Sequence, residues 1–353
     1  MQAGSTERTT LLLTVAVSTL PLRDSRWLEF ASARPEALPV HHPAWGLLLE
    51  ECYDFASLAL VHENNGTISA GMPVLQVRRP LGAVRWISLP FTDFAPPLGE
   101  ASEVERLAGE LDGELTTHGV KQLEVRAPLP GGMPVTDEPP LLHTLPLDAD
   151  PEVVESRFKD SVRRNVRKGE RNGVTVRRGA QETDLVDVFY GLHVETRRRL
   201  GVPVQPRRFF RLLWRDLVAP GLGFVLLAEK GGRPIAAAVF LAWNGTVAYK
   251  YGASDPNWLS LRPNDVLFRD AIRWACANGY HTLDFGRTDA HADGLRRFKL
   301  GWGCEESPLG YSVVGGEPPR LTSSESTALA PLLRRSPAWV TRLVGELLYK
   351  YAA

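Results

Sequence analysis

The chain has 353 residues, which is long for one hydrophobic core and enough for two domains of roughly 150 residues each. Hydrophobic residues make up 44% and charged residues 23% of it, as in an ordinary soluble globular protein. The formal net charge is zero, yet residues 1–147 hold 10 Lys/Arg and 18 Asp/Glu, whereas the rest holds 31 and 23. Either a polyanionic partner binds the second half, or two oppositely charged domains attract each other.

Three widely spaced cysteines, Cys52, Cys276 and Cys304, form neither a disulfide framework nor a zinc pattern. The eight histidines show no metal-ligand spacing. These patterns predict a reduced, cytoplasmic protein without a metal or other cofactor. The apolar run over residues 11–22 is shorter than the roughly 20 residues that span a bilayer, and no signal-peptide pattern surrounds it. We therefore interpret it as a first β-strand.

The first half then continues with a predicted helix over residues 43–55. Three strands follow over residues 57–91, with breaks at Asn65-Gly66 and Leu81-Gly82. A helix that ends at Gly119 and a strand over residues 121–128 complete this half.

A strongly basic segment opens the second half: residues 157–171 hold seven basic and two acidic residues. We predict a helix that ends at Asn172-Gly173 and buries Phe158, Val162 and Val166 on one face. Its other faces offer a secondary contact with phosphates or anionic lipid, through Arg163, Arg164, Arg167 and Lys168. No aromatic side chain is interleaved to stack on bases.

The rest of the second half is predicted to form regular helices and strands. Helices are expected over residues 183–201 and 205–218, and three strands over residues 223–254. An amphipathic helix over residues 262–279 precedes a strand that ends at 284–286. A short helix at residues 294–299 and a final strand pair at residues 305–314 close the half.

Both halves thus contain a three-stranded meander followed by a helix and a strand, although their sequences are not alike. By analogy, this order is the core of the GNAT acyltransferase fold. We predict an α/β protein with mixed sheets and two tandem GNAT-like domains, over residues 9–147 and 148–316. Residues 317–334 are interpreted as a linker and residues 335–353 as a helix that completes the first domain. A ligand is expected in a cleft near the junction.

Five blocks of sequence carry a resemblance to a known family. They are "SLPFTDFAPPL" (88–98), "FKDSVRRNVRKGERNGV" (158–174), "YKYGASD" (249–255), "LRPNDVLFRDAIRWACANGYHTLDFGR" (261–287) and "FKLGWG" (298–303). In this order and spacing they resemble the FemAB-type transferases. The resemblance covers about residues 9–316.

The resemblance implies an amide-forming aminoacyltransferase. Its best-known members move an amino acid from aminoacyl-tRNA to an amine of a peptidoglycan precursor, and relatives use other amines, such as those of polysaccharides or metabolites. The long helical arm that some members insert is absent here, so an acyl-CoA or carrier-protein thioester is an alternative donor. A non-catalytic scaffold that binds tRNA or an envelope precursor is a second alternative.

Acyl transfer to an amine needs a neutral amine, a polarised carbonyl and a route for the proton. No G-x-S-x-G elbow is present, which favours direct attack without a covalent enzyme intermediate. Lys299 of "FKLGWG" is our candidate for the cation that stabilises the oxyanion or a donor phosphate. Asp93 of "FTDFAPP" is our candidate for the group that orients the acceptor amine or takes its proton, although Asp also often begins such turns.

Further candidates lie at strand and helix ends. Arg262 and Asn264 occupy the place where GNAT acetyltransferases carry a glycine-rich pyrophosphate loop, and the missing glycines argue against ordinary acetyl-CoA binding. The remaining substrate-binding candidates are Arg197, Tyr251, Asp255, Asp284 and Arg287.

The C-terminal segment predicts an amphipathic helix with Trp339, Leu343, Leu347 and Tyr351 at four-residue steps. The resemblance implies that this last helix packs on the first domain. The alternative is docking on the inner face of the membrane.

Overall fold

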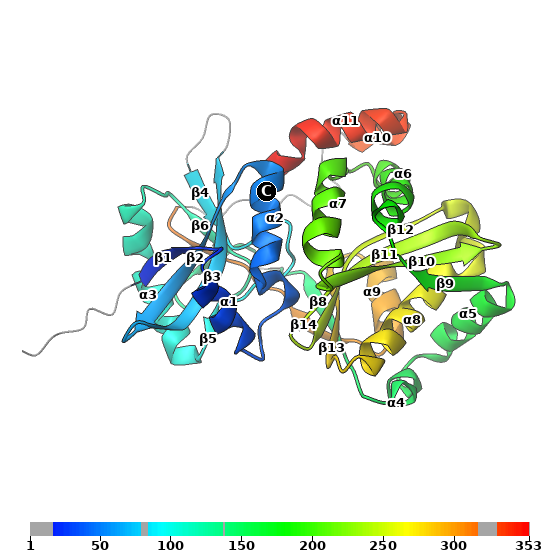
Figure 1. Cartoon of the computed structure of the whole chain (residues 1–353), viewed down its shortest axis with the longest axis horizontal. Helices are drawn as coiled ribbons and strands as arrows, with labels where there is room; N and C mark the ends of the chain where they lie inside the picture. The colour runs from blue at the N-terminus through cyan, green and yellow to red at the C-terminus, as the bar shows by residue number, and fades with distance from the viewer. Residues whose placement is uncertain (1–16, 79–83, 137, 317–329, 353) are drawn as a thin grey trace, which may run out of the picture.

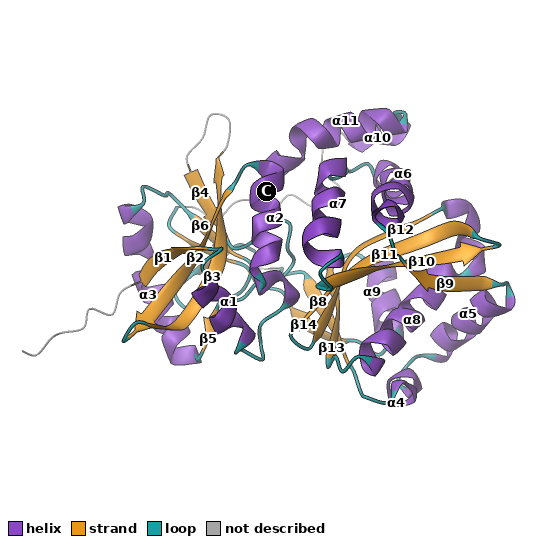
Figure 2. Ribbon diagram, in the orientation of Figure 1, coloured by secondary structure: helices purple, strands orange, loops and turns teal. Residues whose placement is uncertain are grey.

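The computed structural model describes residues 17–78, 84–136, 138–316 and 330–352. Two mixed β-sheets stand side by side, each with helices on both faces (Figures 1 and 2). The predicted α/β class and the tandem arrangement are therefore confirmed. The turn expected at Leu81-Gly82, residues 11–16 of the expected first strand and residues 317–329 of the expected linker lie outside the described ranges.

The first sheet is built mainly from the first half of the chain. Successive side chains along its strands point to opposite faces of the sheet, and both faces are buried. Helix α3 (Ala101–Thr117) covers one face, and α1 (Ser25–Ser32) and α2 (Pro43–Tyr53) cover the other. In spatial order its strands are β1 (Val17–Pro21), β2 (Ala56–Asn64), β3 (Thr67–Arg78), β4 (Val84–Ile87), β6 (Leu123–Val125), β15 (Ser312–Val314) and β7 (Met133–Pro134), with β5 (Leu98–Gly99) paired to β3.

The second sheet lies to the right in Figure 1. Its strands in spatial order are β14 (Glu305–Pro308), β8 (Leu141–Pro146), β13 (Thr282–Thr288), β12 (Thr246–Ser254), β11 (Arg233–Trp243), β10 (Gly223–Lys230) and β9 (Val174–Arg178). The outer face is covered by α4 (Pro151–Ser156), α5 (Asp160–Arg171), α8 (Pro263–Ala277) and α9 (Asp293–Gly301). The inner face is covered by α6 (Tyr190–Leu200) and α7 (Arg207–Leu213), which are flanked by the π-helical turns η2 (Asp184–Phe189) and η3 (Trp214–Val218).

The two sheets exchange strands across the junction. β8 precedes the expected boundary at 147/148 but pairs with β13 and β14 of the second sheet. β15 follows α9 but pairs with β6 and β7 of the first sheet. The expected final strand pair over residues 305–314 is therefore wrong, because β14 and β15 belong to different sheets.

One hydrophobic core is shared by the two halves. Trp45 and Tyr53 of α2 pack against Phe209 of α7, with ring centroids 6.1 and 6.2 Å apart. The C-terminal helices α10 (Ala330–Arg335) and α11 (Ala338–Leu348) pack mainly on α6, so the last helix does not complete the first sheet alone. The turn that follows, η5 (Tyr349–Ala352), reaches the first half, where Tyr349 stacks on Tyr53.

The basic segment folds as predicted, with a shorter helix. α5 begins at Asp160 because the chain turns between α4 and α5, and Phe158 is already buried in that turn. Val162 and Val166 are buried on the inward side of α5. The apolar face that the sequence predicts is thus confirmed.

Two β-bulges and a strand separation shape the site. β12 and β13 run parallel and pair only from Thr246 to Ala248, beyond which they diverge. Opposite Val239 and Phe240, the register of β12 shifts so that Lys250 is the extra residue. A second bulge, between Asp284 and Gly286, lies where β13 contacts Asp93 of the first half.

Candidate active site at the junction of the two sheets

Asp93 is held across the junction by residues of the second half. Its carboxylate Oδ2 accepts a hydrogen bond from the backbone N–H of Arg287 at 3.2 Å. Its carbonyl oxygen accepts one from the Tyr311 hydroxyl at 2.8 Å. Gly286 has φ +73°, and a Cβ there would lie 2.8 Å from Asp93 Oδ2. A glycine is therefore required where the β13 bulge meets this carboxylate.

Lys299 lies beneath the same bulge. The side chain is 3% exposed, and its ammonium donates to the carbonyls of Gly286 at 2.8 Å and Arg287 at 2.9 Å. A lysine ammonium has three N–H donors, and two of them are used by these carbonyls of the described residues, so the third can serve a ligand. Burial lowers the pKa of Lys299 to about 8, against the opposing effect of Asp93 and Asp284.

Asp284 and Lys250 complete the charged cluster. Burial raises the pKa of Asp284 to about 6, although its carboxylate accepts a 2.7 Å hydrogen bond from the Gly286 N–H. Lys250, at the β12 bulge, donates to the carbonyl of Phe91 at 2.6 Å, and burial lowers its pKa. The structure thus brings together four of the sequence-predicted residues, namely Asp93, Asp284, Arg287 and Lys299, and adds Lys250.

A large cavity, which we call the apolar pocket, opens where β12 and β13 diverge. Its volume is about 870 Å³, and Lys299 lines one side. Much of the wall is apolar, formed by Leu259, Leu267, Phe268, Phe285, Leu295 and Phe298. Tyr249, which faces the pocket from β12, requires Gly252 beside it, because a Cβ there would lie 1.8 Å from the Tyr249 hydroxyl.

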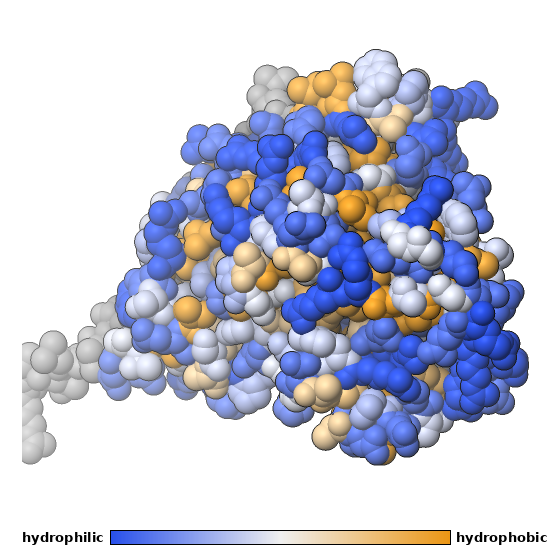
Figure 3. All heavy atoms as spheres, turned by 45° about the vertical axis from the view of Figure 1, so that its right-hand side comes forward, coloured by the Kyte–Doolittle hydropathy of each residue, from blue (hydrophilic) through white to orange (hydrophobic). Residues whose placement is uncertain are grey.

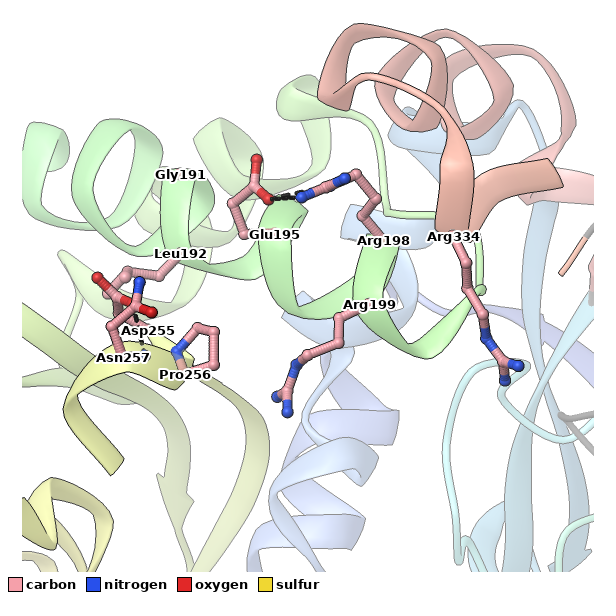
Figure 4. A pocket seen from close by; sticks show the side chains of 9 residues that line it. All are labelled: Gly191, Leu192, Glu195, Arg198, Arg199, Asp255, Pro256, Asn257 and Arg334. Atoms are coloured by element: carbon pink, nitrogen blue, oxygen red, sulfur yellow. Dashed lines mark hydrogen bonds and ion pairs between the residues drawn. The ribbon is translucent and has the colours of Figure 1, made fainter. Parts of the chain in front are cut away.

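A second cavity, the arginine pocket, adjoins the apolar pocket, and Arg199 lines both. It measures about 540 Å³ and lies between α6, α10 and the turn η4 (Pro256–Leu261). Figure 4 shows Arg198 paired with Glu195, whereas Arg199 and Arg334 extend away from that pair. The Arg198–Glu195 distance is 2.8 Å. An anion beside the apolar pocket would meet Arg199 and Arg334, although Glu195 and Asp255 also line this cavity and Arg334 donates to the carbonyl of Leu200 at 3.3 Å.

The start of α8 does not offer a pyrophosphate cradle. Arg262 caps this helix in a left-handed conformation, with φ 60°, and Pro263 supplies no N–H. Asp265 lies buried in the first turn and accepts a hydrogen bond from Asn165 at 3.3 Å. A carboxylate here opposes a bound anion. Asn264 instead lines the apolar pocket.

Three other sequence candidates lie outside the charged cluster around the β13 bulge. Tyr251 is packed among aromatic rings of the shared core, and its buried hydroxyl has no hydrogen-bond partner among the described residues. Asp255 caps η4, pairs with Arg233 and also lines the arginine pocket. Arg197 donates to the carbonyl of Pro203 at 2.9 Å, and its neighbours Arg198 and Arg199 line the arginine pocket instead.

The basic face of α5 lies at the outer edge of the second half (Figure 1). Arg164, Arg167 and Lys168 are exposed there. Arg163 is fixed locally, since it pairs with Asp160 at 2.6 Å and donates to the carbonyls of Glu155 and Ser156. Three of the four predicted surface residues therefore face solvent.

Sequence reasoning missed Lys250, Tyr249 and the arginine pocket. Regular strand alternation places Tyr249 and Tyr251 on one face, but the bulge at Lys250 separates them and turns the lysine toward the junction. The sequence carries a faint signal in "YKYGAS", a lysine between two aromatic residues of a buried strand. Arg334 lies far along the chain from Arg199, so only the fold shows that they are neighbours.

Within the part of the chain that the structure describes, no cluster of His, Cys, Asp or Glu could hold a metal ion. No described helix combines the length and apolar character needed to cross a bilayer.

Comparison with known proteins identifies the domain and the fold. Residues 156–306 match the family model of the acetyltransferase (GNAT) domain. The crystal structure of FemX is similar with a TM-score of 0.69 and 14% identity, covering 84% of this chain and 96% of FemX. The C-terminal domain of a putative lysylphosphatidylglycerol synthetase from Agrobacterium fabrum gives a TM-score of 0.53 at 13% identity, covering 91% of this chain and 95% of that chain.

The structure of L-PGS from Bacillus licheniformis gives a TM-score of 0.52 at 12% identity, covering 91% of this chain and 97% of that chain. No curated protein sequence matches the chain. At these identities the structural likeness establishes a shared fold, which is the tandem GNAT-like fold that the sequence resemblance implied.

Proposed function

Because this tandem GNAT-fold chain carries an acyltransferase domain in its second half, we propose that it transfers an aminoacyl group from aminoacyl-tRNA to an amine. The proposal rests on one observation: residues of both halves contact the same bulge of β13. Asp93 from the first half contacts the β13 bulge, and Lys299 binds the other side of that bulge while lining the apolar pocket. We propose that donor and acceptor meet beside this bulge.

In the proposed mechanism the amine attacks the ester carbonyl of the donor directly. A C–N bond forms, and the carbonyl oxygen becomes an oxyanion that the remaining N–H of Lys299 stabilises. The attacking amine loses a proton to a carboxylate of the cluster. Asp284, with its pKa raised to about 6, is ionised near neutrality yet is a stronger base than an ordinary carboxylate. The C–O ester bond then breaks, and the proton passes to the departing tRNA hydroxyl.

A tRNA donor is favoured by where the cations lie. An acyl-CoA would place its pyrophosphate at the start of α8, but Asp265 occupies that turn and Pro263 offers no donor. We propose that phosphates of the donor instead bind near Arg199 and Arg334, beside the apolar pocket. The exposed face of α5 adds three cations along the outer edge, Arg164, Arg167 and Lys168.

The acceptor is proposed to approach from the first half, past Asp93. An amine of a cell-wall precursor, a polysaccharide or a small metabolite fits a site with an exposed carboxylate. Arg287, whose backbone holds Asp93, pairs through its side chain with Asp289 at 2.6 Å.

A transfer assay tests the proposed function. Charged tRNA bearing labelled amino acids is mixed with the protein and with panels of cell-wall precursors, amino sugars and polyamines. We expect an alkali-stable amide product that disappears when ribonuclease is added first. Lys299→Ala should lower the rate by about 100- to 1,000-fold, because it removes the oxyanion donor. Lys121→Ala, which removes an exposed lysine of the first half, should leave the rate unchanged.

The alternatives give different results in the same assay. A ribonuclease-insensitive reaction with acyl thioesters would replace the tRNA donor by a thioester. Salt-sensitive tRNA binding without transfer of any acyl group would indicate the scaffold alternative. Because the substitution Lys299→Ala leaves two carbonyls without their donor, the unfolding temperature of the variant is measured alongside, and the loss of rate counts only if the variant is folded at the assay temperature.

A peripheral membrane contact is also proposed, through the outer face of α11. Three of the seven large hydrophobic side chains that are exposed among the described residues lie there: Trp339 at 63%, Leu343 at 51% and Leu347 at 60% exposure. The side chain of Tyr351 lies outside the described set. Hydrophobic residues gather at the top of the molecule in Figure 3, where the C-terminal helices lie in Figure 1. Arg335 and Arg342 of the C-terminal helices are also exposed and would favour anionic lipid, although Arg342 lies over the ring of Tyr190 on α6.

Sedimentation with vesicles measures this contact. We expect the protein to pellet with phosphatidylglycerol-containing vesicles more than with pure phosphatidylcholine vesicles. The double variant Trp339→Asp/Leu343→Asp should lower the bound fraction several-fold, since two exposed apolar side chains supply most of the insertion energy. Val153→Asp, at an apolar side chain on α4 that is 40% exposed, is the matched control. Equal binding of all three proteins to both vesicles would contradict the contact.

A further inference from the structure

We propose that the acyl group transferred by this protein carries a large apolar side chain, aromatic or branched aliphatic, which fills the apolar pocket. The inference rests on the proposed function, because it assumes that the pocket beside Lys299 receives the acyl part of the donor. It adds the chemical class of the group that is transferred.

The wall of the apolar pocket is shaped for rings or branched chains. Phe268 and Phe285 are stacked with centroids 5.0 Å apart and an interplanar angle of 10°. Phe298 meets Phe268 edge-on at 5.6 Å. Residues Ala237 and Ala238 of β11 line the pocket, and the small side chain of Ala238 lies on the same face of the sheet as the rings, so space is left there for a ligand. Apolar and aromatic groups are attracted to such walls by burial and ring geometry.

The charges around the pocket disfavour a cationic side chain. Lys299 and Arg199 both line it, and no lining residue is acidic among those that the structure describes. A lysyl side chain would therefore meet two cations and no partner. An acidic side chain directed at the three rings would lose its hydration without gaining a hydrogen-bond donor there.

The size of the pocket disfavours the smallest acyl groups. A glycyl or alanyl group would leave much of the volume of about 870 Å³ unfilled, even with the terminal nucleoside of the donor inside. Burying a leucyl or phenylalanyl side chain adds affinity on the order of 10- to 100-fold over a glycyl group. The pocket therefore selects for apolar area as well as against a cationic side chain.

Stable donor analogues measure this selectivity. The probes are amides of 3′-amino-3′-deoxyadenosine with phenylalanine, leucine, glycine, lysine and glutamate, titrated calorimetrically into the full-length protein. We expect the phenylalanyl and leucyl amides to bind at least about 10-fold more tightly than the other three. Equal binding of all five, or preference for the glycyl, lysyl or glutamyl amide, would overturn the inference.

A matched pair of variants ties the preference to the pocket. Leu295 lines the pocket from α9 and is 46% exposed, so Leu295→Glu should fold normally while placing a carboxylate at the wall. We expect it to reduce the ratio of phenylalanyl to lysyl binding by about 10-fold. Val153→Glu, at a 40% exposed position of α4 outside the pocket, should keep the ratio of the parent protein. An unchanged ratio in Leu295→Glu would also overturn the inference.

A second probe series separates this inference from the proposed donor. If no adenosine amide binds, the tRNA donor fails, and N-acetylcysteamine thioesters with acetyl, octanoyl and phenylacetyl groups are titrated instead. Preference for octanoyl or phenylacetyl over acetyl would uphold the apolar acyl group with a different carrier. Absence of that preference would overturn it.

Discussion

Two groups of opposite charge at the β13 bulge, buried Lys299 and half-buried Asp284, have their pKa values moved toward each other. Burial raises the pKa of Asp284 to about 6 and lowers the pKa of Lys299 to about 8. Each shift means that the ionised form is less stable in the folded protein than in water. Keeping both groups charged near neutrality therefore costs folding free energy. In return the site holds a carboxylate that is more basic than usual beside an ammonium that is more acidic than usual.

The proposed mechanism predicts a bell-shaped pH dependence of kcat/KM. Activity should rise as Asp284 ionises through about pH 6 and fall as Lys299 loses its proton through about pH 8. Lys299→Arg, which stays protonated, should remove the upper limb, and Asp284→Asn should remove the lower limb along with most activity. Steady-state rates between pH 5 and 9.5 measure both limbs. A parent enzyme whose kcat/KM is flat over this range would exclude these assignments.

The same shifts have a defined sign for stability. The raised pKa of Asp284 contributes stability that is present below about pH 4 and lost as pH rises through about 6. The lowered pKa of Lys299 contributes stability that is present above about pH 10.5 and lost as pH falls through about 8. Asp284→Asn should therefore unfold at the same or a higher temperature than the parent protein at pH 7, because the amide oxygen can still accept from Gly286. Thermal unfolding at pH 4.5 and pH 7 measures the difference, and a lower unfolding temperature of the variant at pH 7 would contradict it.

At the scale of elements, α5 combines a buried apolar face with an exposed basic one. We expect the triple variant Arg164→Gln/Arg167→Gln/Lys168→Gln to fold normally, because all three side chains are exposed. It should weaken tRNA binding and reduce the slope of log affinity against log salt by roughly one for each phosphate that the variant no longer neutralises. Filter binding from 50 to 300 mM salt measures the slope. Arg163→Gln is a poor test of this surface, because Arg163 is bound to Asp160 and to two carbonyls. An unchanged slope in the triple variant would remove α5 from the donor surface.

Elements bounded by local signals were predictable from the sequence, and features set by tertiary pairing were not. The turn at Asn244-Gly245 and the end of α6 at Gly201 depend on left-handed residues that the sequence displays. The bulge at Lys250 and the pairing of β15 with β6 depend on partners distant in the chain. For the same reason Lys299 and Asp93 could be predicted as separate motifs, whereas their meeting at Gly286 could not.

At the scale of the whole molecule, strand exchange and the shared core join the two sheets into one folding unit. A fragment of residues 148–316 lacks β8, which leaves β13 without its antiparallel neighbour, and it carries β15 without β6. It also exposes Phe209, which α2 buries in the full chain. The fragment cut at the sequence-based boundary should therefore fail to fold, although it contains the whole matched domain.

The full chain should unfold in one cooperative transition, in contrast to two independently stable domains. Phe209 is 1% exposed between α2 and the second sheet, so Phe209→Ala leaves a cavity that costs about 3–5 kcal/mol. For a chain of 353 residues this corresponds to a fall in unfolding temperature of about 4–7 °C. Because the cavity lies in the core that both halves share, the single transition should move as a whole and remain single. Differential scanning calorimetry measures the ratio of calorimetric to van't Hoff enthalpy, expected near one. Two transitions, of which the substitution shifts only one, would show that the sheets unfold separately and that Asp93 and Lys299 are joined by docking rather than by folding.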